Sequence, residues 1–270
     1  MSKVILITGA SSGIGLASAK MLLSEGHIVY GAARRIQNMS EIEKLGGKAI
    51  KLDVTDSSAI KLAVDQIVAE QGRIDVLLNN AGYGMFGAVE DVSLEDAKRQ
   101  FEVNVFGLAD VSKAVVPIMR KQNCGKIINI SSMGGKMHTP LGGWYHSSKY
   151  AVEGLSDCMR FELKQFGIDV VLVEPGAINS AWYDIMLKNL KSTADNSHYK
   201  TYIDGYENYV LQNRKHFSKT DVVAKTVCKA IKSRKPHARY LVGYMAKPSI
   251  LLYKLLPSKV YDSFLHLIFK

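Results

Sequence analysis

The sequence predicts an α/β protein, in which helices cover both faces of a central parallel sheet of about seven strands to form a three-layer α/β/α sandwich. Two observations predict this class. Short, nearly all-apolar, β-branched segments alternate with longer segments of helical periodicity from residue 4 to residue 173, and strands that are apolar on both faces are typical of a parallel sheet between helices. No Pro-, Gly- or Ser-rich linker divides the chain, so residues 1–270 are expected to form one domain.

The expected strands and helices follow one another in alternation. Six strands are expected in the first two thirds of the chain, at 4–7, 28–30, 49–52, 76–78, 126–130 and 170–173. Helical periodicity predicts helices between them at 14–25, 57–71, 94–121 and 146–166. A helix near 220–233 and a strand near 240–242 are expected to complete the sheet.

Two segments depart from this alternation. Residues 177–217 are rich in tyrosine and show no strand pattern, and an insertion at the carboxyl edge of a parallel sheet is a usual place for a substrate lid. The tail, about 246–270, is apolar and basic. It is expected to pack on the body of the protein, to pair with another subunit, or to lie on a membrane surface.

The composition excludes several classes of protein. With 47% hydrophobic and 22% charged residues, the chain is expected to fold rather than to be disordered. Its three cysteines form no C-x-x-C pair, which argues against a disulfide scaffold, a zinc site and a secreted protein. The apolar run at the start is too short for a signal peptide, and no stretch is long enough to span a membrane. A cytoplasmic protein without a metal is expected.

The net charge of +10 is concentrated in the last fifth of the chain. Residues 1–213 contain 22 Lys+Arg and 23 Asp+Glu, whereas residues 214–270 contain 13 Lys+Arg and 2 Asp+Glu. Such an excess indicates either an anionic partner, such as an anionic membrane contacted peripherally, or the solvated face of a terminal helix. Nucleic acid is not expected, because no recognition motif accompanies the charge.

A glycine-rich turn joins the first predicted strand to the first helix. Its sequence, Thr8-Gly9-Ala10-Ser11-Ser12-Gly13-Ile14-Gly15, leaves the amino end of the helix free of bulky side chains, so that the N–H groups there can bind a pyrophosphate. A nucleoside-triphosphate loop is excluded, because no Lys-Ser/Thr pair follows the last glycine. The alternative is a purely structural turn. The dinucleotide site is expected to include Gly9, Ser11, Ser12, Gly13, Ile14 and Gly15.

The ends of the next three predicted strands are expected to complete the dinucleotide site. Arg34 and Arg35 occupy the position where an acidic residue would select NAD, and two guanidinium groups suit the 2′-phosphate of NADP(H) instead. The alternative is an exposed basic loop. Asp53, which precedes Val54, can accept from the adenine amino group or cap a helix. Small residues after the fourth strand would let the backbone lie against the cofactor, at Asn80, Ala81 and Gly82.

Tyr145 and Lys149 are four residues apart, a spacing that places a phenol and an ammonium on one face of a helix. The spacing alone is weak evidence, because the chain is rich in both residue types. Its surroundings strengthen it: a strand ends at Ile130 and is followed by Ser131-Ser132, by the flexible pair Gly134-Gly135, and then by the Tyr–Lys helix.

Together these motifs resemble the main branch of the short-chain dehydrogenase/reductase family. T-G-A-S-S-G-I-G, N-N-A-G, an Asn in the fourth helix, a Ser 13 residues before Y-x-x-x-K, and P-G after the sixth strand occur in the family's order between Thr8 and Gly176. The tail is similar to that of hydroxysteroid-dehydrogenase-like members. The resemblance implies a Rossmann-type fold and a homodimer or homotetramer assembled through the fourth and fifth helices.

The resemblance also implies roles for individual residues. Ser132, Tyr145 and Lys149 would form a catalytic triad, which Asn104 would complete to a tetrad; the serine assignment rests on spacing, because Ser131 is adjacent. Tyr145 and Lys149 would also contact the cofactor. The nicotinamide side would be lined by Pro175, Gly176 and Ile178. At Asn179-Ser180 many family members have a Thr that contacts the nicotinamide group, and Ser180 is expected to replace it.

The expected chemistry is proton transfer beside the nicotinamide ring. An ammonium about 4 Å from a phenol contributes on the order of 4 kcal/mol at an effective dielectric constant of 20, which would lower the pKa of Tyr145 by up to ~3 units. Tyr145 would then exchange a proton with the substrate oxygen, to which Ser132 would donate a hydrogen bond. Asn104 would hold a water that links Lys149 to solvent. His146 is expected to be exposed, because it points about 100° away from Tyr145 on the helix.

The sequence predicts an NADP(H)-dependent oxidoreductase for an apolar ketone or secondary alcohol, such as a steroid, a retinoid or an acyl-like carbonyl compound. Apolar residues flank the predicted site, and those expected to contact the substrate are Met133, Trp144, Trp182, Tyr183 and Met186, with Met137 and Leu141 nearby. Core packing explains some of them equally well. The alternative function is a non-catalytic NADP(H) sensor on the same fold, although such a protein usually lacks the Tyr or the Lys.

Overall fold

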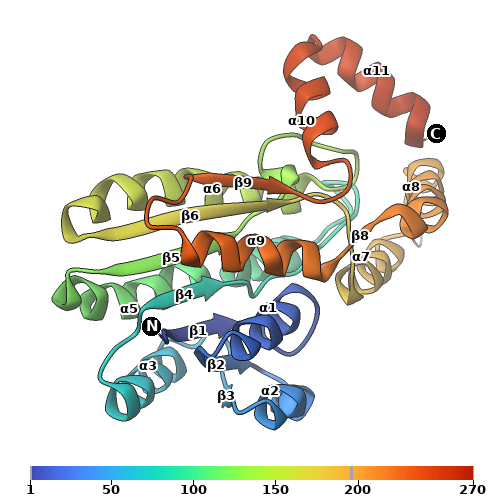
Figure 1. The fold of residues 1–270 in the computed structure, drawn as a ribbon. Coiled ribbons are helices and arrows are strands. Elements are labelled where there is room, and N and C mark those ends of the chain that lie inside the picture. Colours follow the sequence, from blue (N-terminus) through green and yellow to red (C-terminus); the bar gives the residue numbers. More distant parts are fainter. Residues whose placement is uncertain (1, 195–196, 270) are drawn as a thin grey trace.

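The central sheet of the computed structural model is parallel, which confirms the predicted three-layer architecture (Figure 1). The model describes residues 2–194 and 197–269. Within them, the sheet has seven strands in the order β3-β2-β1-β4-β5-β6-β9. The strands are β1 (Val4–Thr8), β2 (Ile28–Ala33), β3 (Lys48–Lys51), β4 (Val76–Asn79), β5 (Gly125–Ile130), β6 (Ile168–Pro175) and β9 (Arg239–Val242). Because they are parallel, their carboxyl ends meet at one edge of the sheet.

Helices cover both faces of this sheet. On one face, α1 (Gly13–Ser24) and α9 (Thr220–Lys232) bury side chains such as Leu22 and Val227 against Ile5 and Ile7 of β1. On the other face, α3 (Ser57–Gln71), α5 (Leu108–Gln122) and α6 (Gly143–Leu163) pack on the alternate residues of the same strands. Successive side chains of a strand point to opposite faces, so strands that are apolar throughout supply both cores.

Three local features differ from the sequence prediction. A π-helical turn, η2 (Glu102–Gly107), separates α4 (Leu94–Phe101) from α5 where one continuous helix was expected. Short helical segments, η1 (Ile36–Met39) and α2 (Ser40–Lys44), follow β2. The expectation of no strand in 177–217 is wrong, because β7 (Ile178–Asn179) pairs with β8 (Ser218–Lys219). A two-residue strand shows no periodicity and therefore leaves no signal in the sequence.

Four helices gather beyond the carboxyl edge of the sheet: α7 (Ala181–Ser192), α8 (Lys200–Asn213), α10 (Ala246–Leu255) and α11 (Ser258–Phe269) (Figure 1). They share an aromatic core, in which the ring of Tyr206 on α8 stacks on that of Phe269 on α11 with centroids 5.0 Å apart. Of the three roles open to the tail, the structure shows packing on the body. Residues 195–196 of the expected lid and residue 270 of the tail lie outside the described residues.

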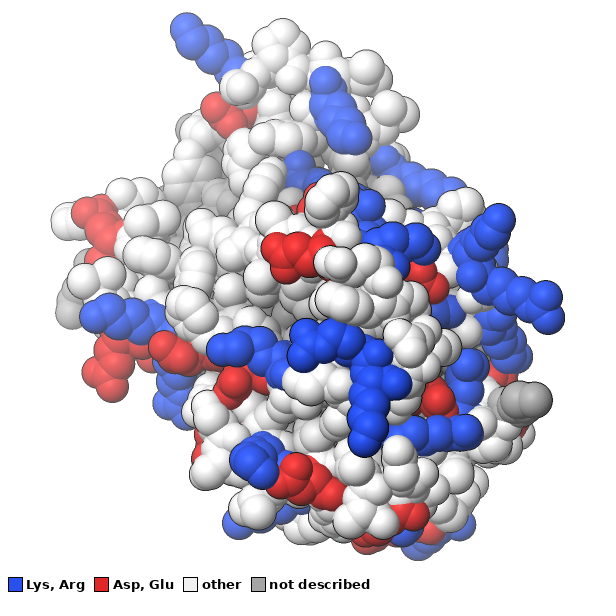
Figure 2. Space-filling model, turned by 90° about the vertical axis from the view of Figure 1, so that its left-hand side faces the viewer, with Lys and Arg blue, Asp and Glu red and all other residues white. Residues whose placement is uncertain are grey.

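Part of the excess positive charge lies along α9 and the loop after it. Lys229, Lys232, Arg234 and Lys235, here called the basic edge, are exposed near the amino ends of the strands. Figure 2 shows this side of the molecule, with Lys and Arg side chains gathered over part of it. The basic edge is therefore opposite the carboxyl edge. None of the helices that the structure describes has both the length and the apolar character needed to cross a bilayer.

Candidate active site

A cavity of about 300 Å³ opens at the carboxyl edge of the central sheet. Its walls come from the segments that follow β1 to β6, and from α6, α7 and α8. In open parallel sheets this edge is where cofactors and substrates bind. The predicted dinucleotide residues that line the cavity are Gly9, Ser11, Ser12, Gly13, Ile14, Arg34, Arg35, Asp53, Val54, Asn80, Ala81, Gly82, Tyr145, Lys149, Pro175, Gly176 and Ile178, and Ser180 lines it too.

The glycine-rich turn is tied closely to the end of β4. Gly9 has φ of +66°, and a Cβ added there would lie 2.8 Å from Cα of Ala81. The hydroxyl of Thr8 accepts hydrogen bonds from the backbone N–H groups of Asn80 and Ala81, at 3.0 and 3.1 Å. Gly15 is the one predicted residue of the turn that does not line the cavity. A Cβ at Gly15 would overlap the carbonyl oxygen of Gly9, so Gly15 permits α1 to pack on the turn.

This turn fits a pyrophosphate. Ser12, the N-cap residue of α1, makes no side-chain hydrogen bond to the first turn of the helix, so the N–H groups there are left for another acceptor. Gly13 has φ of +57°, and the nearest atom to a Cβ added there would be Cβ of Ser180, 3.7 Å away. The backbone is therefore open to close approach by an anionic group.

Two arginines and an aspartate lie at the far end of the cavity. Arg34 and Arg35 are exposed, and Nη1 of Arg34 lies 4.0 Å from Oδ2 of Asp53. The other oxygen of Asp53 accepts from the backbone and the hydroxyl of Thr55. Asp56, rather than Asp53, caps α3. The helix-cap alternative for Asp53 is therefore wrong, and Oδ2 lies beside a guanidinium in the cavity wall.

Three residues of the expected tetrad, Ser132, Tyr145 and Lys149, line the other end of the cavity. Nζ of Lys149 donates to the carbonyl of Ile130 at 3.0 Å and lies 6.0 Å from the centre of the Tyr145 ring. Ser131 and Ser132 both line the cavity, at the start of η3 (Met133–Gly135). Ser131 is almost fully buried, and its hydroxyl has no hydrogen-bond partner among the described residues. The structure brings Ser132, Tyr145 and Lys149 together, as the resemblance implied.

Asn104 lies in the π-helical turn η2 and is buried behind Gly82 and Lys149, so it does not line the cavity itself. Its side chain accepts from the backbone N–H of Tyr83 and donates to the carbonyl of the same residue, at 3.1 and 3.0 Å. It also donates to the hydroxyl of Ser148 on α6. A Cβ added to Gly82 would lie 3.0 Å from Oδ1 of Asn104 and 3.7 Å from Nζ of Lys149. Asn104 therefore fixes the chain after β4 against the Tyr–Lys helix.

The pKa values of the Tyr–Lys pair differ from the sequence prediction. Burial raises the pKa of Tyr145 to about 12, and a hydrogen bond with the Ser132 side chain opposes that shift. Burial lowers the pKa of Lys149 to about 8, and the charge of Glu153 opposes that shift. The expected lowering of the Tyr145 pKa is thus wrong for this structure, because loss of hydration favours the neutral form of both groups.

The cavity wall corrects the set of expected substrate residues. Met133, Met137, Trp182 and Tyr183 line it. Trp144 does not, because its indole packs in a separate cluster and its N–H donates to the carbonyl of Val89 at 3.3 Å. Met186 and Leu141 lie in the core among α7, α8 and the tail helices and do not reach the cavity either. The wall also contains residues that the sequence analysis missed: Phe86, Thr139, His146, Ile185 and Tyr206.

His146 is buried, and the prediction of an exposed side chain is wrong. The segment 133–142 folds over the helix and covers the imidazole, which the direction of the side chain on the helix does not predict. Burial lowers the pKa of His146 to about 4, so the ring is neutral near neutral pH.

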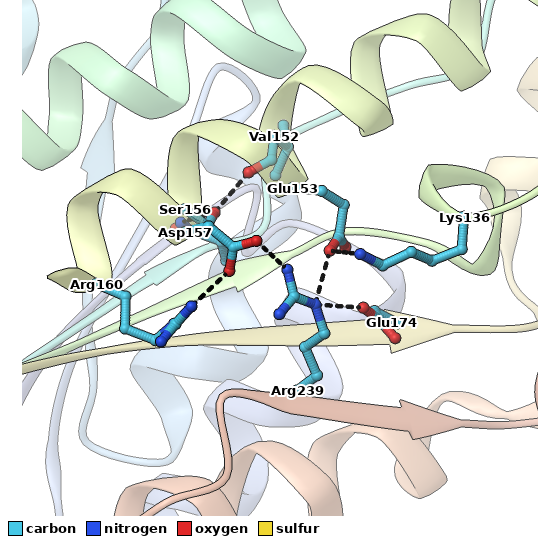
Figure 3. A network of polar contacts seen from close by, with 9 residues as sticks. Lys136, Val152, Glu153, Ser156, Asp157, Arg160, Glu174 and Arg239 are labelled. Atoms are coloured by element: carbon cyan, nitrogen blue, oxygen red, sulfur yellow. Dashed lines mark hydrogen bonds and ion pairs between the residues drawn. The ribbon is translucent and has the colours of Figure 1, made fainter.

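An ion network connects α6 to the last strand of the sheet (Figure 3). The guanidinium of Arg239 lies between Glu153, Asp157 and Glu174, with nitrogen–oxygen distances of 3.0, 2.6 and 3.2 Å. Lys136, which follows η3, binds Glu153 at 2.8 Å. Burial and the neighbouring Glu153 raise the pKa of Glu174 to about 7. The network fixes the segment after β5 and strand β9 against the helix that contains Tyr145.

Comparison with known proteins gives one consistent result. The family model described as short chain dehydrogenase matches residues 3–190. A 3-ketodihydrosphingosine reductase from Bacteroides thetaiotaomicron is 40% identical over 243 residues, which cover 89% of this chain and 88% of that protein. The crystal structure of a short-chain dehydrogenase from Streptomyces avermitilis superposes with a TM-score of 0.84 at 29% identity, covering 97% and 95% of the two chains. The crystal structure of a short-chain dehydrogenase/reductase from Burkholderia phymatum in complex with NAD superposes with a TM-score of 0.80 at 25% identity, covering 97% of this chain and 94% of that one.

Proposed function

This chain belongs to the short-chain dehydrogenase family, and we propose that it transfers hydride between NADP(H) and an apolar ketone or secondary alcohol. As a member of that family it is an oxidoreductase that uses a nicotinamide cofactor and acts on CH–OH or ketone groups. The observation that supports the proposal best is the single cavity in which the glycine-rich turn, Ser132, Tyr145 and Lys149 meet an aromatic and methionine-rich wall.

In the proposed reaction, Tyr145 gives its proton to the carbonyl oxygen of the substrate. The bound cofactor supplies the hydride. Ser132 donates a hydrogen bond to the same oxygen, where negative charge develops. The raised pKa of Tyr145 keeps the phenol protonated, and an alkoxide is a strong enough base to take that proton. Lys149, held by Ile130, orients the cofactor ribose beside the phenol and, with Asn104, connects the site to solvent for proton return.

The preference for NADP(H) is proposed from Arg34 and Arg35. Both side chains are exposed in the cavity wall that would face the adenosine ribose, and Arg34 has Asp53 as its nearest acidic partner at 4.0 Å. A 2′-phosphate carries more negative charge than the Asp53 carboxylate, which lies 4.0 Å from Arg34, and pairs well with a guanidinium. The two arginines therefore favour the phosphorylated cofactor.

The substrate class is proposed from the cavity wall and from one relative. Phe86, Met133, Met137, Trp182 and Tyr206 form an apolar surface next to Tyr145. The ring centroids of Tyr145 and Trp182 are 5.2 Å apart. The similar protein from Bacteroides thetaiotaomicron is named for the reduction of a long-chain ketone. Steroid-, retinoid- and acyl-like carbonyl compounds all fit such a wall, and we propose that α7 and α8 form the lid over it.

The deciding experiment is a substrate screen with NADPH and NADH in parallel. Long-chain 3-keto compounds, steroids and retinals should be reduced with NADPH, with a higher kcat/KM than with NADH. Turnover of small polar ketones alone would contradict the apolar class, and equal or better use of NADH would contradict the cofactor preference. Binding of NADPH without turnover of any compound would favour the sensor function.

We also propose that the protein is a homo-oligomer and that its tail contacts lipid. Leu94 and Phe106 in the expected helix 94–121 are 66% and 57% exposed, and Phe161 in the expected helix 146–166 is 86% exposed, which supports an interface through these two helices. Light scattering should then give a dimer or tetramer mass.

The tail helices have exposed apolar side chains with three lysines nearby, Lys247, Lys254 and Lys259, and this combination suits a membrane surface. The exposed apolar residues are Leu251, Leu255, Val260, Phe264 and Leu267. Co-sedimentation with neutral and anionic vesicles tests this contact and its electrostatic part.

A cytoplasmic location is proposed on a single ground. Cys124, Cys158 and Cys228 are all free thiols, as expected in a reducing compartment.

A further inference from the structure

The hydrogen bonds of the His146 ring fix its tautomer. The backbone N–H of Thr139 donates to Nε2 at 3.1 Å, so Nε2 is the unprotonated nitrogen. Nδ1 lies 3.0 Å from the carbonyl oxygen of Gly134 and must therefore donate its proton to that oxygen. With both nitrogens engaged, the ring has neither a free acceptor nor a free donor for a reacting group.

The segment 133–142, here called the substrate loop, closes tightly around this ring. A Cβ added to Gly134 would lie 2.6 Å from Nδ1, and one added to Gly142 would lie 2.5 Å from Nε2. The backbone N–H of His146 also donates to the carbonyl of Gly142 at 2.8 Å. The backbone at both ends of the loop thus packs directly against the imidazole, and only glycine allows the backbone to come this close to the ring.

The same ring is connected to the helix above the cavity. The hydroxyl of Thr139 lies 3.0 Å from Nε2 of His146, and Thr139 and Tyr206 of α8 both line the cavity. The ring of Phe86, another part of the cavity wall, is 5.5 Å from that of Tyr206 and 6.2 Å from the imidazole. His146 therefore contacts the substrate loop and Phe86 of the segment after β4, and Phe86 in turn contacts α8.

We propose that His146 is a positioning residue: it holds the substrate loop and, through Phe86, the lid helix α8 as one wall of the cavity, and so determines how an apolar carbonyl compound is seated beside Tyr145. The proposal rests on the proposed function for the identity of the substrate. Met133, Met137 and Thr139 of the loop face the cavity, so a displaced loop changes the apolar surface that the substrate meets. Ser132 precedes Gly134 and Tyr145 follows Gly142, so both lie outside the substrate loop and are displaced less.

Three substitutions test the hydrogen bonds of Nδ1 and Nε2 independently of the planar shape of the ring. His146→Phe keeps a planar ring but removes both bonds. His146→Asn places an amide near the position of Nδ1 and can still donate to Gly134, whereas His146→Gln reaches the position of Nε2 and can still accept from Thr139. His138→Gln is the matched control, because His138 belongs to the same loop, is partly exposed and does not line the cavity.

The expected result is a division between KM and kcat. His146→Phe should raise KM for the best long-chain ketone by about tenfold or more and change the ranking of ketones by chain length, because two buried hydrogen bonds are lost, while kcat stays within about threefold. His146→Asn and His146→Gln should each recover part of the loss. The control should match the wild type, and the Kd for NADPH should be unchanged in all variants. Unchanged KM and ranking in His146→Phe would overturn the proposal, as would a loss of kcat alone.

Hydrogen exchange gives a measurement that does not depend on turnover. In His146→Phe with NADPH bound, the amides of the substrate loop and of α8 should exchange about tenfold faster or more, while those of β1 and α1 keep their protection. If the wild type reduces no ketone, the proposed function fails, and this measurement still decides the positioning role of His146. Equal exchange in the loop and in α8 would refute that role, and faster exchange throughout the chain would show general destabilisation instead.

Discussion

The ammonium nitrogen of Lys149 lies 6.0 Å from the centre of the Tyr145 ring and is held there by the carbonyl of Ile130 at 3.0 Å. Both side chains are almost fully buried. The pair is thus placed by the end of β5 rather than by a direct hydrogen bond between phenol and ammonium. A cofactor ribose beside Lys149 would have the phenol next to it.

Tyr145→Phe should lower kcat for ketone reduction by about 100-fold or more, because the proton donor is lost while the ring still fills its place. The Kd for NADPH should stay within about twofold, since the substitution removes one hydroxyl from a large binding surface. Steady-state assays and fluorescence titration measure the two effects. Tyr150→Phe, on the exposed side of the same helix, is the control. A variant that keeps more than about a tenth of wild-type kcat would contradict the role of Tyr145.

Replacing both Arg34 and Arg35 by alanine should lower kcat/KM for NADPH by about 10- to 100-fold, because two charge-assisted contacts to the 2′-phosphate are lost. The value for NADH should change by less than about threefold. The matched control is Arg234→Ala, an exposed arginine of the basic edge on the opposite side of the molecule. Equal losses with both cofactors would show that the arginines do not select the phosphate.

Glu174→Gln should change how stability depends on pH. The pKa of Glu174 is raised to about 7 in the folded protein, above its ordinary value of 4.5, so the folded state binds this proton more tightly than the unfolded state does. Protonated Glu174 makes its full contribution to the free energy of unfolding below about pH 4.5, and this contribution is lost as the pH rises through 7. Between pH 5 and 8 the wild type should therefore lose on the order of 2 kcal/mol relative to the variant.

Urea unfolding of both proteins at several pH values measures this difference. Subtracting the variant from the wild type removes the contribution of other carboxylates, such as Glu70, whose pKa is lowered to about 2 and which acts in the opposite direction. Glu43→Gln, on the exposed surface of α2, is the control. Parallel pH profiles of wild type and Glu174→Gln would be inconsistent with a proton held at this site.

Gly15→Ala and Gly154→Ala should have opposite effects on stability. A Cβ at Gly15 would overlap the carbonyl of Gly9, so the substitution should destabilise the protein by about 2 kcal/mol or more and weaken NADPH binding. Gly154 is also helical, but no atom lies within 4 Å of a Cβ added there. Alanine should be stabilising at that position by up to about 1 kcal/mol. Thermal unfolding compares the two, and a neutral Gly15→Ala would show that the turn and α1 can move apart.

Local spacing and order were sufficient to predict most of the site. The glycine-rich turn and the Tyr145–Lys149 pair depend on one strand–helix junction or one helical face, and such features are encoded within a few residues. His146 and Trp144 were misjudged because a helix fixes the direction of a side chain but not which loop covers it. The predicted pKa of Tyr145 is wrong for a related reason. The distance between the phenol and the ammonium can be predicted from their spacing in the sequence, whereas the hydration of the two groups depends on the surrounding fold.

The basic edge has a consequence for handling the molecule. Lys229, Lys232, Arg234 and Lys235 form a cationic region at the amino ends of the strands, and the cavity mouth lies at the other end. Four cations lie close together in the basic edge, whereas the three lysines of the tail are spread over two helices. A cation-exchange resin should therefore adsorb the enzyme mainly by the basic edge, with the entrance to the catalytic cavity turned toward the flowing solution. Immobilised in this orientation, it should remain accessible to dissolved cofactor and ketone.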